Sequence, residues 1–182
     1  MNPTIDITNI KIQTPRLTLR PWKHEDLDDF YEYARVDGVG QRAGWLPHEN
    51  KEKSRQILEG FIEKKKVFAI EYNKKVIGSL GVEYYREDDF PELASLKGRE
   101  LGYVLSKDYW GLGLMPEAVK AVIEYLFEKE GLDFIIISYF EWNRQSARVA
   151  EKCGLKPIKN TVHETRYGTK EPTVCTIIYN KK

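Results

Sequence analysis

The sequence predicts a mixed α/β fold in a single domain spanning residues 1–182. Three observations carry this prediction. The length suits one domain with a substantial core. The 41% apolar and 31% charged content is typical of a globular chain. Finally, a strand-helix-strand unit lies at the centre of the chain, where two parallel strands with a right-handed crossover are expected. Its parts are Arg99–Leu105, Pro116–Glu130 and Phe134–Tyr139.

The segments before this unit alternate between strand and helix patterns. Arg16–Arg20 alternates apolar and basic residues, which indicates a strand. Apolar residues at helical spacing follow, and after a glycine-rich loop they recur behind Asn50, a good helix N-cap. Two further strand-like runs read as a hairpin. In order, we expect a helix at 24–36, a loop at 37–47, a helix from Asn50 to about Lys66, strands at 67–72 and 76–85 joined by 73–75, and a polar loop at 86–98.

The segments after it complete the order of elements. Pro116 suits a first helical position and Gly131 the residue past a helix end. The apolar run Phe134–Tyr139 reads as a buried strand. Asn143–Lys152 reads as a short helix closed by Gly154. The remaining 155–179 reads as two strands around a turn at 167–170.

Composition excludes several classes of function. The net charge is +1 with both signs interspersed, so the chain lacks the basic face of a nucleic-acid-binding protein. The first residues contain no apolar signal-peptide core, and no apolar run approaches the ~18 residues of a membrane span. We therefore expect a cytoplasmic protein that does not contact a membrane. Cys153 and Cys175 stand in no metal-binding spacing and read as buried thiols, and the three histidines are scattered, so no metal is expected.

The connection into the central helix carries the clearest chemical signal. Gly111 and Gly113 allow a tight turn and a close approach of a ligand to the backbone. The helix that follows offers free amides and the positive end of its dipole, and Met115, just before Pro116, is a poor N-cap. A phosphate or pyrophosphate would satisfy these donors. A simple tight turn is the alternative. The loop is not a P-loop, and it lacks the third glycine of a dinucleotide fingerprint, although Asp133 keeps that interpretation open.

Several motifs read together resemble the GNAT superfamily of N-acetyltransferases, and most closely its RimJ/RimL-type branch of ribosomal-protein N-terminal acetyltransferases. The resemblance covers roughly residues 12–156. The matching motifs are Thr14–Trp22, Ala43–Glu49, Glu100 with Gly102-Tyr103, Tyr109-Trp110-Gly111-Leu112-Gly113, Asn143 with Ser146, and Glu151-Lys152 with Gly154.

This resemblance implies a GNAT fold, in which a central mixed sheet is flanked by helices and two parallel strands splay apart. It also implies acetyl-CoA as co-substrate, with the pantetheine arm in the gap between those strands. Backbone at Leu105 would pair with the arm, Asn143 would hydrogen-bond it, and Ser146 would lie near the sulfur. The pyrophosphate would be held by amides of Trp110, Gly111, Leu112, Gly113, Leu114 and Met115.

Two positions depart from the family pattern. Leu112 stands between the glycines, where Lys or another polar residue is common, and this removes a charge contact. Met115 stands where a small residue is common and is expected to crowd the loop.

Acetyl transfer requires a neutral amine, a stabilised oxyanion and a proton for the leaving thiolate. Glu100 is the candidate base. Gly102 and Val104 share its strand face, so we expect its side chain to point into the cleft. The alternative is an edge carboxylate paired with Arg99 or a lysine. If Glu100 is not the base, solution water, Glu83 or Glu141 remains. Ser146 is the candidate acid, with Tyr139 as the alternative. Either Asn143 or Ser146 is expected to cap the last helix.

The predicted function is transfer of acetyl from acetyl-CoA to a primary amine, on a protein N-terminus or on a small molecule. The alternatives are a non-catalytic acyl-CoA-binding module and a dinucleotide-binding domain. Trp45 reads as a loop anchor or an acceptor contact, and Glu87–Asp89 as a solvated loop or a cation-attracting cluster. Relatives in the resembled family often dimerise, so a homodimer is compatible with the sequence.

Overall fold

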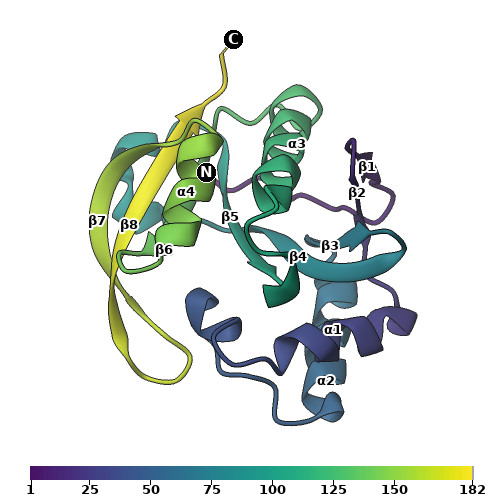
Figure 1. The fold of residues 1–182 in the computed structure, drawn as a ribbon. Coiled ribbons are helices and arrows are strands. Elements are labelled where there is room, and N and C mark those ends of the chain that lie inside the picture. The colour runs from purple at the N-terminus through teal and green to yellow at the C-terminus, as the bar shows by residue number, and fades with distance from the viewer. Residues whose placement is uncertain (182) are drawn as a thin grey trace.

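The computed structural model describes residues 1–181, and its centre is an eight-stranded mixed sheet. The strand order is β1-β2-β3-β4-β5-β6-β8-β7, and Figure 1 shows β7 and β8 at one edge with β1 and β2 at the other. The strands are β1 (Ile12–Gln13), β2 (Leu17–Pro21), β3 (Val67–Tyr72), β4 (Lys75–Glu83), β5 (Gly98–Leu105), β6 (Phe134–Phe140), β7 (Lys156–Glu164) and β8 (Lys170–Tyr179).

Helices cover both faces of this sheet. Side chains of α3 and α4 join one core with apolar residues of β2 to β6, whereas α1 and α2 join a second core on the opposite face of β3 and β4. Figure 1 shows α3 beside α4, and α1 beside α2. The helices are α1 (Leu27–Ala34), α2 (Lys51–Lys64), α3 (Leu114–Glu128) and α4 (Arg144–Lys152), with short 3-10 turns at 24–26, 40–43, 87–89, 91–93 and 107–109.

The predicted fold class is confirmed, and so is the predicted order of elements, except that a short strand, β1, precedes the first predicted one. Asn50 caps α2, since its side chain accepts the Lys53 amide at 2.9 Å. The hairpin turn is shorter than expected: Asn73 and Lys74 take positive φ and Lys75 already belongs to β4, as in tight two-residue hairpin turns. The first helix starts later than predicted, because 24–26 form a 3-10 turn.

The start of α3 differs from the prediction in a way that matters for the site. The helix begins at Leu114, with Gly113 as its N-cap at φ 75°, so Met115 lies inside the helix. Pro116 is tolerated as the third helical residue because amides of the first turn have no intrahelical partner. The Met115 side chain is buried in the core with α3 and α4, and Met115 also lines the cavity of the candidate site.

The strands β5 and β6 form the parallel pair that the sequence predicts, but only briefly. Their register joins Gly98–Glu100 with Phe134–Ile136, and no further pairs are formed before the strands end at Leu105 and Phe140. Beyond Glu100 the two strands diverge. This splay opens the middle of the sheet at the carboxyl ends of its parallel strands, where ligands bind in many α/β folds.

Candidate active site

A cavity of about 670 Å³ fills the splay between β5 and β6 and reaches both faces of the sheet. Its size is in the range of small-molecule and cofactor sites. The predicted site residues that line it are Glu100, Leu105, Trp110, Gly111, Gly113, Leu114, Met115, Tyr139, Asn143 and Ser146. Leu112 is 53% exposed and is not among the residues that line the cavity.

The glycine loop is shaped for close approach of a ligand. Gly111 and Gly113 have φ values of 79° and 75°, a region that side-chain-bearing residues rarely adopt. No side chain caps the start of α3. A ligand on this side would therefore meet free amides and the positive end of a 15-residue helix.

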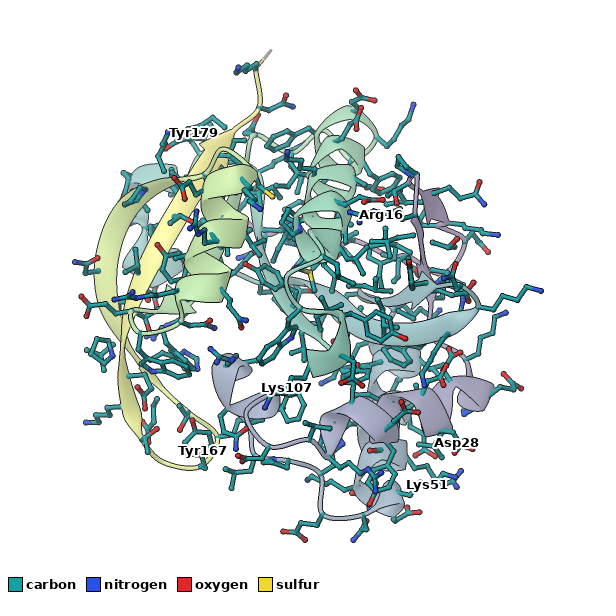
Figure 2. All side chains as sticks on the ribbon, in the orientation of Figure 1. Arg16, Asp28, Lys51, Lys107, Tyr167 and Tyr179 are labelled. Atoms are coloured by element: carbon teal, nitrogen blue, oxygen red, sulfur yellow. The ribbon has the colours of Figure 1, made fainter. Side chains whose placement is uncertain are left out.

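A cluster formed by Thr14, Arg16 and Glu117 holds this loop against the β1–β2 connection. Arg16, labelled beside α3 in Figure 2, donates to the Leu112 carbonyl at 2.9 Å and through Nε to Glu117 at 2.7 Å. Thr14 donates to the same carboxylate at 2.6 Å. Burial acts to raise the pKa of Glu117, but the hydrogen bonds from Thr14 and Arg16 outweigh it and the pKa is lowered. The carboxylate thus stays ionised and the loop is anchored.

Arg42 lies over the opposite rim of the cavity, between two indole rings. Its guanidinium carbon is 4.9 Å from the Trp110 ring centre and 5.6 Å from that of Trp142. The Trp110 indole in turn donates to the Leu105 carbonyl at 2.9 Å. These contacts connect the 40–43 turn, the glycine loop and the segment before α4 around one opening.

Asn143 is the N-cap of α4, which is one of the two predicted alternatives. Its side chain accepts the Ser146 amide and exchanges hydrogen bonds with Arg42, each at 3.3 Å. The side chain is 4% exposed. Because 3.3 Å is beyond the usual range for such bonds, a ligand could replace one of them at little cost.

Ser146 lies beside Tyr103, which belongs to the Gly102-Tyr103 motif but was not predicted to have a role. The Tyr103 hydroxyl lies 2.8 Å from Ser146 Oγ. Burial raises the pKa of Tyr103 well above its usual value, and it also raises the pKa of Tyr139, with the charge of Glu151 contributing. Both phenols therefore keep their protons at neutral pH. The sequence contained one signal for this position of Tyr103: side chains alternate along β5, which puts Tyr103 on the face opposite Glu100.

Glu100 lines the same cavity from the other face of the sheet. Burial raises the pKa of this carboxyl, the charges of Glu83 and Asp89 raise it further, and a hydrogen bond with Ser138 opposes them. Glu83 is its direct cross-strand neighbour and forms an ion pair with Lys66. The alternative expectation, an ion pair with Arg99, does not hold: Arg99 belongs to the opposite face and lies 3.9 Å from the Tyr84 ring centre.

The remaining sequence predictions have structural outcomes as well. Trp45 packs on His48 with ring centres 5.0 Å apart and lies over Gly40, so it anchors its loop. Both cysteines are buried. Within residues 1–181 there is no cluster of three His, Cys, Asp or Glu side chains suited to a metal ion, nor a helix long and apolar enough to cross a membrane.

The Acetyltransferase (GNAT) domain family model matches residues 16–156 of the chain. The chain belongs to the GNAT acetyltransferase family. The uncharacterized N-acetyltransferase p20 of Bacillus licheniformis is 29% identical over 133 residues, which are 68% of this GNAT acetyltransferase and 70% of p20.

Solved structures share the fold of this GNAT acetyltransferase. A GNAT-family acetyltransferase from Bacillus anthracis superposes with a TM-score of 0.82 at 20% identity, covering 95% of this chain and 100% of that one. RimL, a ribosomal L7/L12 alpha-N-protein acetyltransferase solved with coenzyme A, gives a TM-score of 0.77 at 13% identity, covering 93% and 98%. The predicted GNAT family and fold are thereby confirmed.

Proposed function

We propose that this GNAT acetyltransferase transfers the acetyl group of acetyl-CoA to a primary amine. One observation supports this most strongly: a single cavity crosses the splayed sheet, with a glycine loop and helix N-terminus on one face and a half-buried carboxyl group on the other. Cofactor and acceptor could then meet from opposite sides of the sheet. The matched family and the acetyltransferase names of the relatives point to the same reaction.

In this proposal the cofactor lies on the α3 side. Amides from Trp110 to Met115 hold the pyrophosphate, and Arg16, which is paired with Glu117, keeps the loop in place through the Leu112 carbonyl. Backbone at Leu105 pairs with the pantetheine arm, and Asn143 gives up one of its long bonds with Arg42 to bind it. This brings the thioester to the splay, near Ser146.

The chemistry follows from the two faces of β5. Glu100 takes a proton from the ammonium group of the acceptor, directly or through water, and the amine attacks the thioester carbonyl. A backbone amide near Leu105 stabilises the oxyanion. As the tetrahedral intermediate collapses, the nitrogen loses its second proton to solvent and the C–S bond breaks. The thiolate takes a proton from Ser146, the Ser146 oxygen takes one from the Tyr103 hydroxyl 2.8 Å away, and Tyr103 regains its proton from solvent. Tyr139 is the second candidate acid.

The acceptor is proposed to be a protein N-terminal α-amine, as for RimL, or the amine of a small molecule. The RimJ/RimL-type motifs favour the first. A non-catalytic acyl-CoA-binding module would keep the glycine loop, but it would not require Glu100 to line the same cavity from the other face. A screen that follows free CoA over peptides and small amines distinguishes the two, since the module releases none.

Acetyl-CoA should stabilise the fold. At about 100 times its dissociation constant it should add roughly 2.7 kcal/mol to the free energy of unfolding, because it binds only the folded state. The measurement is a melting curve with and without acetyl-CoA, with NAD and ATP at equal concentration as controls. A rise in Tm with NAD or ATP but not with acetyl-CoA would contradict the assignment of the glycine loop to CoA.

A further inference from the structure

A second cavity of about 230 Å³ adjoins the reaction cavity on the face that carries Glu100. The two share Glu83, Gly102 and Val104 as lining residues, together with Ala43 and Tyr103, so they are continuous over β4 and β5. The second cavity extends from there under α1 and α2. Its own lining is formed by Phe30, Trp45, His48, Ile57, Phe61 and Val67, together with Ser79, Gly81 and Arg166.

The floor that joins the two cavities is a strip of sheet without side chains. Gly81 of β4 and Gly102 of β5 are direct cross-strand partners, and both line the second cavity. A Cβ added at Gly102 would meet no atom within 4 Å, so the space above it is open. A Cβ added at Gly81 would instead meet the Glu83 side chain, with Oε1 at 2.7 Å. The next cross-strand pair on the same face of the sheet, toward the reaction cavity, is Glu83 with Glu100. An extended group can therefore run from Glu100 over Gly102, beside the Glu83 carboxylate.

The second cavity suits an apolar group rather than a charged one. Five of its lining side chains are aromatic or aliphatic, and the polar ones that belong to it alone are Ser79, His48 and Arg166. His48 is neutral at physiological pH, because burial, with the charges of Lys53 and Arg166, lowers its pKa to about 4. Its Nδ1 is already within 2.7 Å of the Ser54 hydroxyl. Arg166 disfavours a second cationic group there. A dry apolar cavity of about 150 Å³ is enough to hold a benzene ring, so this one has room for a ring-sized substituent.

We propose that this second cavity is the side-chain subsite of the acceptor, and that the enzyme acetylates primary amines that carry a compact apolar group, preferably aromatic. The inference rests on the proposed function. The amine lies at Glu100, the connecting carbons pass over Gly102, and the apolar group packs against Ile57, Phe61 and Trp45. The same chemistry is offered by an arylalkyl amine and by a peptide with Phe at its N-terminus.

The test compares matched acceptors with enzyme variants at one wall. The parent should use phenylethylamine roughly 10- to 100-fold better than ethylamine in kcat/KM, because burial of the ring adds binding energy. A peptide pair beginning with Phe or Ser tests the peptide source in the same way. Ile57 lines only the second cavity. Ile57→Phe should fill it and lower kcat/KM for phenylethylamine about tenfold, while ethylamine and the Kd of acetyl-CoA change less than twofold.

Ile57→Ala should enlarge the cavity and shift preference toward a bicyclic arylalkyl amine. Gly60→Ala, on the same helix with open space around it and outside both cavities, is the control that should change neither. Equal rates for ring-bearing and ring-free acceptors in the parent, or equal losses for both in Ile57→Phe, would overturn the subsite. Failure of every amine to release CoA would instead overturn the proposed acetyltransfer to amines.

Discussion

Glu100→Gln is expected to lower kcat/KM for acetyl transfer by roughly 10²- to 10⁴-fold near neutral pH, the range found for general acid–base groups. The Gln side chain keeps the size of Glu100 but cannot accept the proton of the ammonium group. Burial, with the charges of Glu83 and Asp89, raises the pKa of the parent carboxyl. Parent activity should therefore rise with pH through a value above that of an ordinary glutamate.

The sign of the pH effect separates a base from a merely structural carboxyl. Below its raised pKa, Glu100 already holds a proton and cannot take another. The pH profile of Glu100→Gln lacks the rise caused by Glu100, and its residual kcat/KM follows deprotonation of the amine itself. The loss of kcat/KM relative to the parent is therefore largest at low pH, and the profile of the variant shifts to higher pH.

Ser146→Ala is the matched control for this comparison. It should lose about 10- to 100-fold without any shift of the profile, because a thiolate is a fair leaving group. Measurement of kcat/KM against pH decides, and a Glu100→Gln profile parallel to the parent at every pH would leave water, Glu83 or Glu141 as the base.

Gly113→Val is expected to weaken acetyl-CoA binding by roughly 10- to 100-fold, the equivalent of one lost hydrogen bond to a charged group. The side chain would stand at the N-cap of α3, over amides that are proposed to hold the pyrophosphate. It would also strain the backbone, since φ is 75° there, at a cost of about 1–2 kcal/mol in the free energy of unfolding.

Gly168→Val provides the control for strain alone. Gly168 has φ 84° and open space around it. It follows Tyr167 in the β7–β8 turn, and Tyr167 is labelled at the tip of that hairpin in Figure 2. Both variants should lose similar stability in denaturant, and only Gly113→Val should lose acetyl-CoA affinity by calorimetry. An unchanged Kd in folded Gly113→Val would mean that the loop is only a turn.

Local patterns in the sequence were sufficient to predict much of this molecule. Alternation along β5 correctly put Glu100, Gly102 and Val104 on one face, because side chains in a strand alternate strictly. The strand-helix-strand order correctly predicted the parallel pair. The start of α3 was wrong by two residues: Pro116 signals a first turn but not which residue of that turn, and Gly113 was read as loop rather than as the N-cap.

The contacts that hold the site together could not be predicted from local patterns. Arg16 reaches Glu117 across 101 residues, and Arg42 reaches Asn143 across the same separation. Each joins a loop to a helix start, where no periodicity constrains the partner. The second cavity is similar, since its glycine floor depends on the β4–β5 register, and register becomes evident only when the two strands are placed side by side.

The brief pairing of β5 with β6 has a consequence for amide hydrogen exchange. An amide in a strand ladder exchanges with water only after its bond opens. The strand β6 pairs with β8 along its whole length from Phe134 to Phe140, whereas β5 and β6 share only the residues up to Glu100 and Ile136. Protection factors should therefore be high on the outer side of β6 and low along the inner edges of both strands past that point. Hydrogen exchange should therefore show one continuous sheet at the Glu100 end of the cavity. At the other end it should show a sheet that is divided between β5 and β6.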